Sequence, residues 1–240
     1  MSVTLVGFDT ATPDVAVAIV RDDTTLDESQ LGADDGPRHA TALLGEIERM
    51  VSAAGGWSAV DRLVVGLGPG SFTGLRIGVA TARALAQGLD KPVTGVGTLD
   101  ALACGIAARP AAAGRPVLAV IDARRSQVFV ALRGPGGARV WEPFVADPRE
   151  LVRRLAELDD PPLAAGDGSL RFRGDLEQAG AEVLPDDDPG HRLAARQVCL
   201  LARSLPGSTP DRIRPIYLRR PDAQAWLERD RGPDGDRSQT

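Results

Sequence analysis

Aromatic residues are scarce in this chain of 240 residues, at 4%, although 43% of all residues are hydrophobic. Leu, Val, Ile and Ala must therefore fill the interior, and the length suits one large domain or two small ones. The sequence also lacks an apolar run long enough to span a membrane. Met1 leads directly into a strand pattern without the charged and apolar regions of a secretory signal, which predicts a cytoplasmic protein.

Cysteine, histidine and net positive charge are also in short supply. Cys104 and Cys199 lie in Ala- and Leu-rich helical patterns, so we expect them to be small core residues in a reducing compartment. His39 and His191 are the only histidines, which are too few for most metal sites and catalytic triads. A net charge of −5 argues against the chain binding nucleic acid by itself. It leaves open a role beside a basic partner.

Glycine is concentrated between a Val-rich run over residues 63–67 and an Ala-rich run over residues 75–87. The two runs are typical of a buried strand and a helix. A structural glycine loop joins them, and its defining residues are Gly68, Pro69, Gly70, Ser71, Thr73 and Gly74. Ser71 or Thr73 can cap the helix. The loop lacks the Lys of a phosphate-binding Walker loop and the flanking glycines of a nucleophile elbow, so it predicts a turn and not chemistry.

A stripe of small residues runs along this helix, at Gly74, Gly78, Ala82 and Ala86. Glycine inside a helix costs about 1 kcal/mol relative to alanine, so the stripe indicates that another backbone comes very close. Either the helix packs on the chain's own sheet or it docks a second subunit. The pattern alone favours the first interpretation.

Two stretches of the chain repeat the same order of elements. Strands are predicted over residues 3–8, 15–20, 26–31, 117–121, 127–132 and 139–145. In each stretch the first strand ends at an aspartate, Asp9 or Asp122, and a helix follows the third strand, over residues 38–53 or 147–158. We therefore predict an N-terminal lobe of residues 1–109, a C-terminal lobe of residues 110–220 and a disordered tail of residues 221–240.

Shorter patterns complete the prediction. Thr98 and Asp147 have the residue types and positions of helix N-caps. Further helices are predicted over residues 99–108, 171–179 and 193–205, and an acidic loop over residues 186–188. In the tail, only Trp226 and Leu227 offer apolar side chains that could dock elsewhere.

Several short segments together resemble one known family over about residues 1–220. They are Phe8-Asp9-Thr10-Ala11-Thr12, GLGPGSFTGLRIGVATARALA, Thr98-Leu99-Asp100-Ala101-Leu102, Ile121-Asp122-Ala123-Arg124 and Pro215-Ile216-Tyr217-Leu218-Arg219. The resemblance is to the TsaB (YeaZ) family of the bacterial tRNA threonylcarbamoyladenosine biosynthesis machinery. It implies an α/β fold with two ribonuclease-H-like lobes of the actin-like ATPase (ASKHA) type.

The resemblance also implies a function without catalysis. Proteins of this family support TsaD, the catalytic paralogue, in a complex with TsaE that transfers a threonylcarbamoyl group to the adenosine beside the tRNA anticodon. The resemblance implies a homodimer when the chain is alone, contact with tRNA only through the complex, no firmly bound cofactor, and ATP or ADP only at the seam of the complex. Asp9, Thr10 and Thr12 would be a vestigial nucleotide loop, because Ala11 replaces the glycine that active members favour there. No metal is expected, because Leu43 follows His39 where a second histidine would be needed.

The partner-binding surface comes from the resemblance too, which places it on the two helices of the first lobe. The residues that it implies are His39, Leu43, Ile47, Met50, Leu75, Arg76, Gly78, Val79, Ala82 and Arg83. Three alternatives stay open. One is a phosphotransferase of the sugar or acetate kinase type, with Asp9 or Asp122 at a metal–nucleotide site. The others are a protease, for which the H-E-x-x-H motif and an elbow serine are lacking, and an interaction module unrelated to tRNA.

Overall fold

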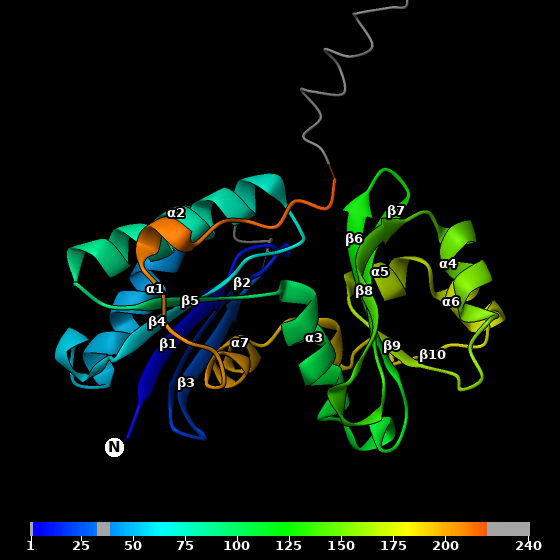
Figure 1. The fold of residues 1–240 in the computed structure, drawn as a ribbon, viewed down its shortest axis with the longest axis horizontal. Coiled ribbons are helices and arrows are strands. Elements are labelled where there is room, and N and C mark those ends of the chain that lie inside the picture. Colours follow the sequence, from blue (N-terminus) through cyan, green and yellow to red (C-terminus); the bar gives the residue numbers. More distant parts are fainter. Residues whose placement is uncertain (1, 33–38, 220–240) are drawn as a thin grey trace, which may run out of the picture.

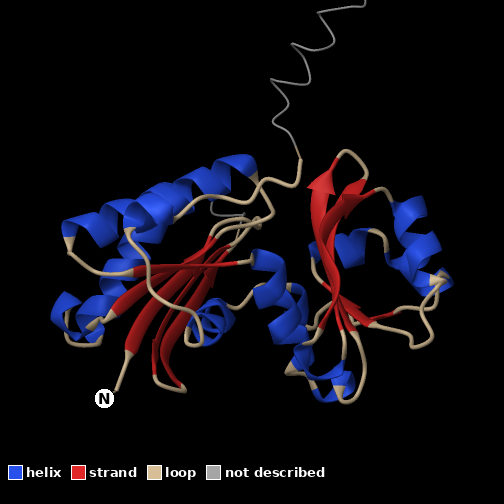
Figure 2. Cartoon of the chain, viewed as in Figure 1, coloured by secondary structure: helices blue, strands red, loops and turns tan. Residues whose placement is uncertain are grey.

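Two five-stranded mixed sheets stand side by side and form the framework of the molecule (Figures 1 and 2). The computed structural model describes residues 2–32 and 39–219. The predicted tail therefore lies outside the described residues. Within the described ranges, no helix is long and apolar enough to cross a membrane.

The first sheet has the strand order β3-β2-β1-β4-β5. β1 (Thr4–Asp9), β2 (Val15–Arg21) and β3 (Thr24–Leu31) are antiparallel, whereas β4 (Arg62–Gly66) and β5 (Val93–Val96) run parallel to β1. Parallel neighbours need crossover connections, which are supplied by α1 (His39–Ala53) and α2 (Phe72–Gly88). Every residue of β1 is buried, because helices cover both faces of the sheet.

The second sheet repeats this pattern with the order β10-β9-β6-β7-β8. β6 (Val117–Arg124), β7 (Gln127–Arg133) and β8 (Arg139–Ala146) are antiparallel, and β9 (Leu163–Ala165) and β10 (Glu182–Val183) are parallel to β6. The helices of this lobe are α4 (Pro148–Leu155), α5 (Asp167–Arg171) and α6 (Arg173–Gln178). Two sheets of this order confirm the predicted α/β fold with paired ribonuclease-H-like lobes.

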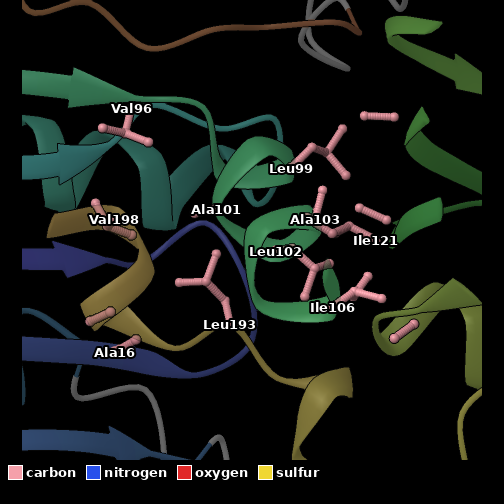
Figure 3. Close-up of a cluster of buried hydrophobic side chains, with 14 of the residues drawn as sticks. Ala16, Val96, Leu99, Ala101, Leu102, Ala103, Ile106, Ile121, Leu193 and Val198 are labelled. Atoms are coloured by element: carbon pink, nitrogen blue, oxygen red, sulfur yellow. The ribbon is translucent and has the colours of Figure 1, made fainter. Parts of the chain in front are cut away.

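Two helices between the sheets join the lobes through one hydrophobic core. They are α3 (Thr98–Ala107) and α7 (Ala195–Ala202). Figure 3 shows Leu99, Leu102 and Ile106 of α3 between the first lobe and Ile121 of β6. α7 packs on β1 and β2, so the chain returns to the first sheet after it has built the second. The division at residue 109 stays a prediction about domains.

Short 3-10 helices and ion pairs order the connecting segments. The 3-10 helices are Trp57–Ala59, Pro110–Ala112, Pro135–Gly137, Pro189–His191 and Pro210–Arg212. In the acidic loop, Asp186 pairs with Arg173 and Asp188 pairs with Arg109. The loop is therefore tied to α6 and to the end of α3.

Some local predictions are confirmed and others need correction. Ser71 and Asp147 cap α2 and α4, because their side chains accept from the amides of Gly74 and Glu150. The helix predicted over residues 171–179 is α6, which begins two residues later because the backbone at Phe172 is not helical, and the preceding α5 was not predicted. The helix predicted over residues 193–205 is only α7, because the backbone just before it is extended. Thr98 is not an N-cap, because Gly97 takes that position and the Thr98 hydroxyl bonds elsewhere.

Candidate functional site: the cleft between the lobes and the paired helices

The glycine loop after β4 closes directly onto the turn between β1 and β2. The Ser71 amide donates to the Ala11 carbonyl oxygen at 2.7 Å, and the Thr10 hydroxyl donates to the Gly74 carbonyl oxygen at 2.7 Å. A Cβ atom at Gly70 would overlap the Ala11 carbonyl oxygen, and one at Gly74 would overlap that of Thr10. The glycines are therefore required for two backbones to touch.

Asp9 lies beneath this junction and is fully buried. Its carboxylate accepts from the Thr98 hydroxyl at 2.7 Å and from the Ala11 amide at 2.6 Å. The Thr98 oxygen in turn accepts from the Gly68 amide at 2.9 Å. Burial raises the pKa of Asp9, and the hydrogen bonds from Thr98 and Ala11 oppose the rise. Asp9 thus connects the end of β1, the glycine loop and the start of α3.

The polar groups of the β1–β2 turn that could meet a nucleotide phosphate are hydrogen-bonded within the first lobe. The Ala11 amide is already bonded to Asp9, the Thr10 hydroxyl to Gly74, and the Thr12 hydroxyl to the Asp14 carbonyl oxygen at 3.4 Å. Both Asp9 oxygens have donors and neither faces solvent. These polar groups of the predicted vestigial loop are therefore bonded within the first lobe. Over residues 2–32 and 39–219, no group of three His, Cys, Asp or Glu side chains could hold a metal ion.

A cavity of about 880 Å³ lies between the two lobes. The β1–β2 turn, the glycine loop and the first turns of α2 form one wall, and residues 121–124 with Phe129 form the other. Residues 216–219 line it as well. Such a volume is in the usual range of about 300–1,000 Å³ for ligand pockets.

Two aspartates from the second lobe line this cavity. The Asp122 amide donates to the Asp167 carboxylate at 3.0 Å, and the Arg171 guanidinium donates to both Asp122 oxygens at 3.0 and 2.9 Å. Burial raises the pKa of Asp167, and the nearby Asp122 charge raises it further. The sequence prediction missed Asp167. The sequence signal for Asp167 is the Gly166-Asp167-Gly168 run directly after β9. This run lies at the same edge of the second sheet as Asp122.

The last described segment, residues 213–219, crosses from one lobe to the other. The Ile216 amide donates to the Leu67 carbonyl oxygen at 2.7 Å, and the Arg219 guanidinium donates to the Ala123 carbonyl oxygen at 2.7 Å. The Tyr217 ring lies 5.2 Å from the Phe72 ring, measured between centroids. The segment therefore links the glycine loop to the turn after β6.

Most of the predicted partner-binding residues lie beneath α1 and α2 and not on their surface. Those that are buried are Leu43, Ile47, Met50, Leu75, Gly78, Val79 and Ala82. Arg76 and Arg83 are exposed, and the side chain of His39 lies outside the described residues. A Cβ atom at Gly78 would overlap the Thr10 hydroxyl. This confirms the interpretation that the small-residue stripe packs on the chain's own sheet.

A second row of small residues, which the sequence prediction missed, covers the outer side of α2. Thr73, Ala80 and Ala84 are exposed, and Ile77 among them is half-buried. The spacing of four, three and four residues is the signal for a single helical face. On α1, Leu44 is 48% exposed and the neighbouring Gly45 has no atom within 4 Å of where a Cβ would lie. We call Leu44, Ile77, Ala80 and Ala84 the outer helix face.

Comparisons with known proteins agree with this architecture. A family model described as "TsaD: tRNA N6-adenosine threonylcarbamoyltransferase" matches residues 35–142. The chain is 34% identical to an uncharacterized protein of Mycobacterium tuberculosis over 92% of this chain and 94% of that protein. It is 30% identical to the Escherichia coli "tRNA threonylcarbamoyladenosine biosynthesis protein TsaB" over 90% and 94% of the two chains. The solved structure "YeaZ from Pseudomonas aeruginosa" superposes with a TM-score of 0.73 at 27% identity, covering 89% of this chain and all of that one.

Proposed function

The chain belongs to the TsaB (YeaZ) family of tRNA threonylcarbamoyladenosine biosynthesis, and on that premise we propose that it acts there as a non-catalytic scaffold subunit. It binds and supports TsaD, the catalytic paralogue of the threonylcarbamoyl transfer, together with TsaE. It contacts tRNA only through this complex, and it pairs with itself when no partner is present. The match of residues 35–142 to the TsaD family model supports a shared ancestry of the two subunits.

The observation that carries the proposal is the outer helix face. The inner stripe of α2 is explained by the close contact with Thr10 and β4, whereas the opposite side presents the exposed alanines Ala80 and Ala84. Ala80 and Ala84 leave the helix backbone open to close approach, and Leu44 and Ile77 add apolar surface on either side. Helices pack with their axes about 8–10 Å apart when the contact residues are small. A helix pair from the partner fits this face.

Two further features support a role without catalysis. The polar groups of the β1–β2 turn are used within the lobe, as is the carboxylate of Asp9. A kinase-type site would need these groups free for a metal and a phosphate. We therefore place any ATP or ADP at the seam with the partner and not in the turn.

Lysine substitutions on α2 test the proposal. Ala80→Lys and Ala84→Lys place long charged side chains on the outer helix face, so we expect the one-to-one species with TsaD from the same organism to be lost. Light scattering on a sizing column measures the species directly. Both positions are exposed, so the melting temperature of the isolated chain should change little.

Ala107→Lys is the matched control, because Ala107 is an exposed alanine at the end of α3, away from α1 and α2. This variant should form the complex as the parent does. Normal complex formation by both Ala80→Lys and Ala84→Lys would refute docking through the outer helix face. A parent chain that forms no complex with TsaD would refute the scaffold proposal itself.

A further inference from the structure

The cavity between the lobes has an apolar wall that the described residues leave partly uncovered. Ile77 of the first lobe and Phe129 of the second line it, as do Ile216, Tyr217 and Leu218. Ile216 and Tyr217 are 41% and 42% exposed, although both are large and mainly apolar. Large apolar side chains gathered around a hollow mark a place where something else packs.

The described chain ends at this same place. Residues 216–219 line the cavity, and Arg219 is fixed to the opposite wall by its bond to the Ala123 carbonyl oxygen. The described chain therefore ends beside the cavity. A fully extended chain spans at most about 3.6 Å per residue, so the seven residues from Arg219 to Trp226 can reach about 25 Å.

Composition singles out one anchor in residues 220–240. Trp226 and Leu227 are the only large apolar residues there, and the rest are Ala, Gly, Pro or polar residues. Around this anchor, residues 220–230 carry three acidic residues, Asp222, Glu228 and Asp230, and two arginines, Arg220 and Arg229. An indole ring carries a large apolar area, of about 150–250 Å², that favours burial.

Two arginines at the cavity are suited to acidic residues beside such an anchor. The Arg76 guanidinium lies 3.9 Å from the centre of the Phe72 ring and pairs with no carboxylate of the described residues. The Arg124 side chain is 73% exposed, and its nearest carboxylate is Asp122 at 3.7 Å, which Arg171 already binds. Both arginines line the cavity.

We propose that residues 220–230 of the same chain dock in the cavity between the lobes, with the Trp226 side chain as the anchor. The occupant is the chain's own C-terminal segment, and the inference does not depend on the proposed function. If the scaffold function also holds, docking has a consequence for it. Phe72, Arg76 and Ile77 belong both to the cavity wall and to the first half of α2, so the docked segment and a partner on the outer helix face would compete.

A full-length variant with a single tryptophan tests the docking. Trp57→Phe and Trp141→Phe together leave Trp226 as the only tryptophan. We expect Trp226 in the folded chain to be quenched by acrylamide several-fold less than in denaturant, with its emission shifted to shorter wavelength. Adding Ile77→Glu, which places a charge in the cavity wall, should restore strong quenching. Adding Ala84→Glu on the same helix, outside the cavity, should not.

The other outcomes overturn the proposal. Quenching of Trp226 in the folded parent as strong as in denaturant would mean that the segment does not dock. Protection that survives both Ile77→Glu and Tyr217→Ala would place the indole elsewhere. Tyr217→Ala is the second variant because this ring is 42% exposed, so we expect the variant to keep the fold. Protection that disappears on dilution would assign the anchor to the cavity of a second copy.

Discussion

Gly74 is a single residue whose lack of a side chain lets two backbones meet at the wall of the cleft. Its own carbonyl oxygen accepts from Thr10, and its bare Cα lies against the Thr10 carbonyl oxygen. Gly74→Ala would force a methyl group onto that oxygen, so the β1–β2 turn or α2 must move. Because overpacking typically costs about 1–3 kcal/mol, we expect a loss of this size in the free energy of unfolding, measured from denaturant midpoints.

Gly88→Ala is the matched control for this prediction. Gly88 is the last residue of α2, is exposed, and has no atom within 4 Å of a would-be Cβ. Alanine is the better helix former, so we expect a gain of up to about 1 kcal/mol. Equal effects of the two substitutions would contradict the close backbone contact at Gly74.

Asp167 predicts a pH dependence of stability. Burial raises its pKa above the ordinary value of 3.8, so the folded chain keeps this proton to a higher pH than the unfolded chain does. Between the two pKa values the folded state binds more protons, and the contribution of Asp167 to stability therefore falls as the pH rises. Asp167→Asn removes the charge, while its amide oxygen can still accept from the Asp122 amide.

Denaturant unfolding of the parent and of Asp167→Asn at a series of pH values measures this effect. We expect the variant to become more stable than the parent as the pH rises from 3.8, through the raised pKa, and the advantage then to stay constant. An advantage that shrinks with rising pH would mean that the folded state lowers the pKa of Asp167.

Residue roles were predictable from the sequence where both partners are close in the chain. Ser71 and Asp147 are caps whose partners lie three residues away, and both predictions are confirmed. Thr98 has the residue type of a cap, but its partner is Asp9, 89 residues away. Only the fold brings Thr98 and Asp9 together. Local spacing therefore predicted a capping role for Thr98 that the structure does not show.

At the scale of elements, sequence patterns predicted the strands β1 to β4 and β6 to β8 and the helices α1 to α4. The inner stripe of small residues on α2 was predicted to pack on the chain's own sheet, but small residues lie on the other side of this helix as well. In the structure, Gly78 lies against Thr10 and Val65, so the inner stripe faces the first sheet. The surface proposed for docking is the outer helix face of Leu44, Ile77, Ala80 and Ala84, which the sequence analysis did not identify.

The helices that sequence patterning misjudged are short and depend on tertiary contacts. α5 was missed because its five residues are too few for a helical period to be recognised. α7 is buried against β1 and β2, so its apolar residues cover nearly its whole surface and blur its ends. Only part of the candidate site was predictable, because it also depends on tertiary contacts. The glycine loop is a local pattern, whereas Asp167 and residues 216–219 come next to it only through the fold.

At the scale of the whole molecule, the core between the lobes argues for one cooperative unit. A single buried cluster includes Leu5 of the first sheet, Leu99 and Leu102 of α3, Ile121 and Leu163 of the second sheet. Arg133 of β7 also pairs with Asp100 of α3 across the same boundary. If either lobe unfolded, the apolar surface of α3 would be exposed. The other lobe would then lose the surface on which it packs.

Tryptophans placed in each lobe make this testable, because Trp57 follows α1 and Trp141 lies in β8. We expect single-tryptophan variants that retain either one to unfold at the same denaturant midpoint. Leu102 is 3% exposed between the lobes, so Leu102→Ala should lower both midpoints together, at a cost of about 2–5 kcal/mol. Leu44→Ala, at a half-exposed position, should change them little. Separate midpoints, or a shift in only one lobe, would mean that the shared core does not couple the two sheets, and the cleft between them would then open without unfolding.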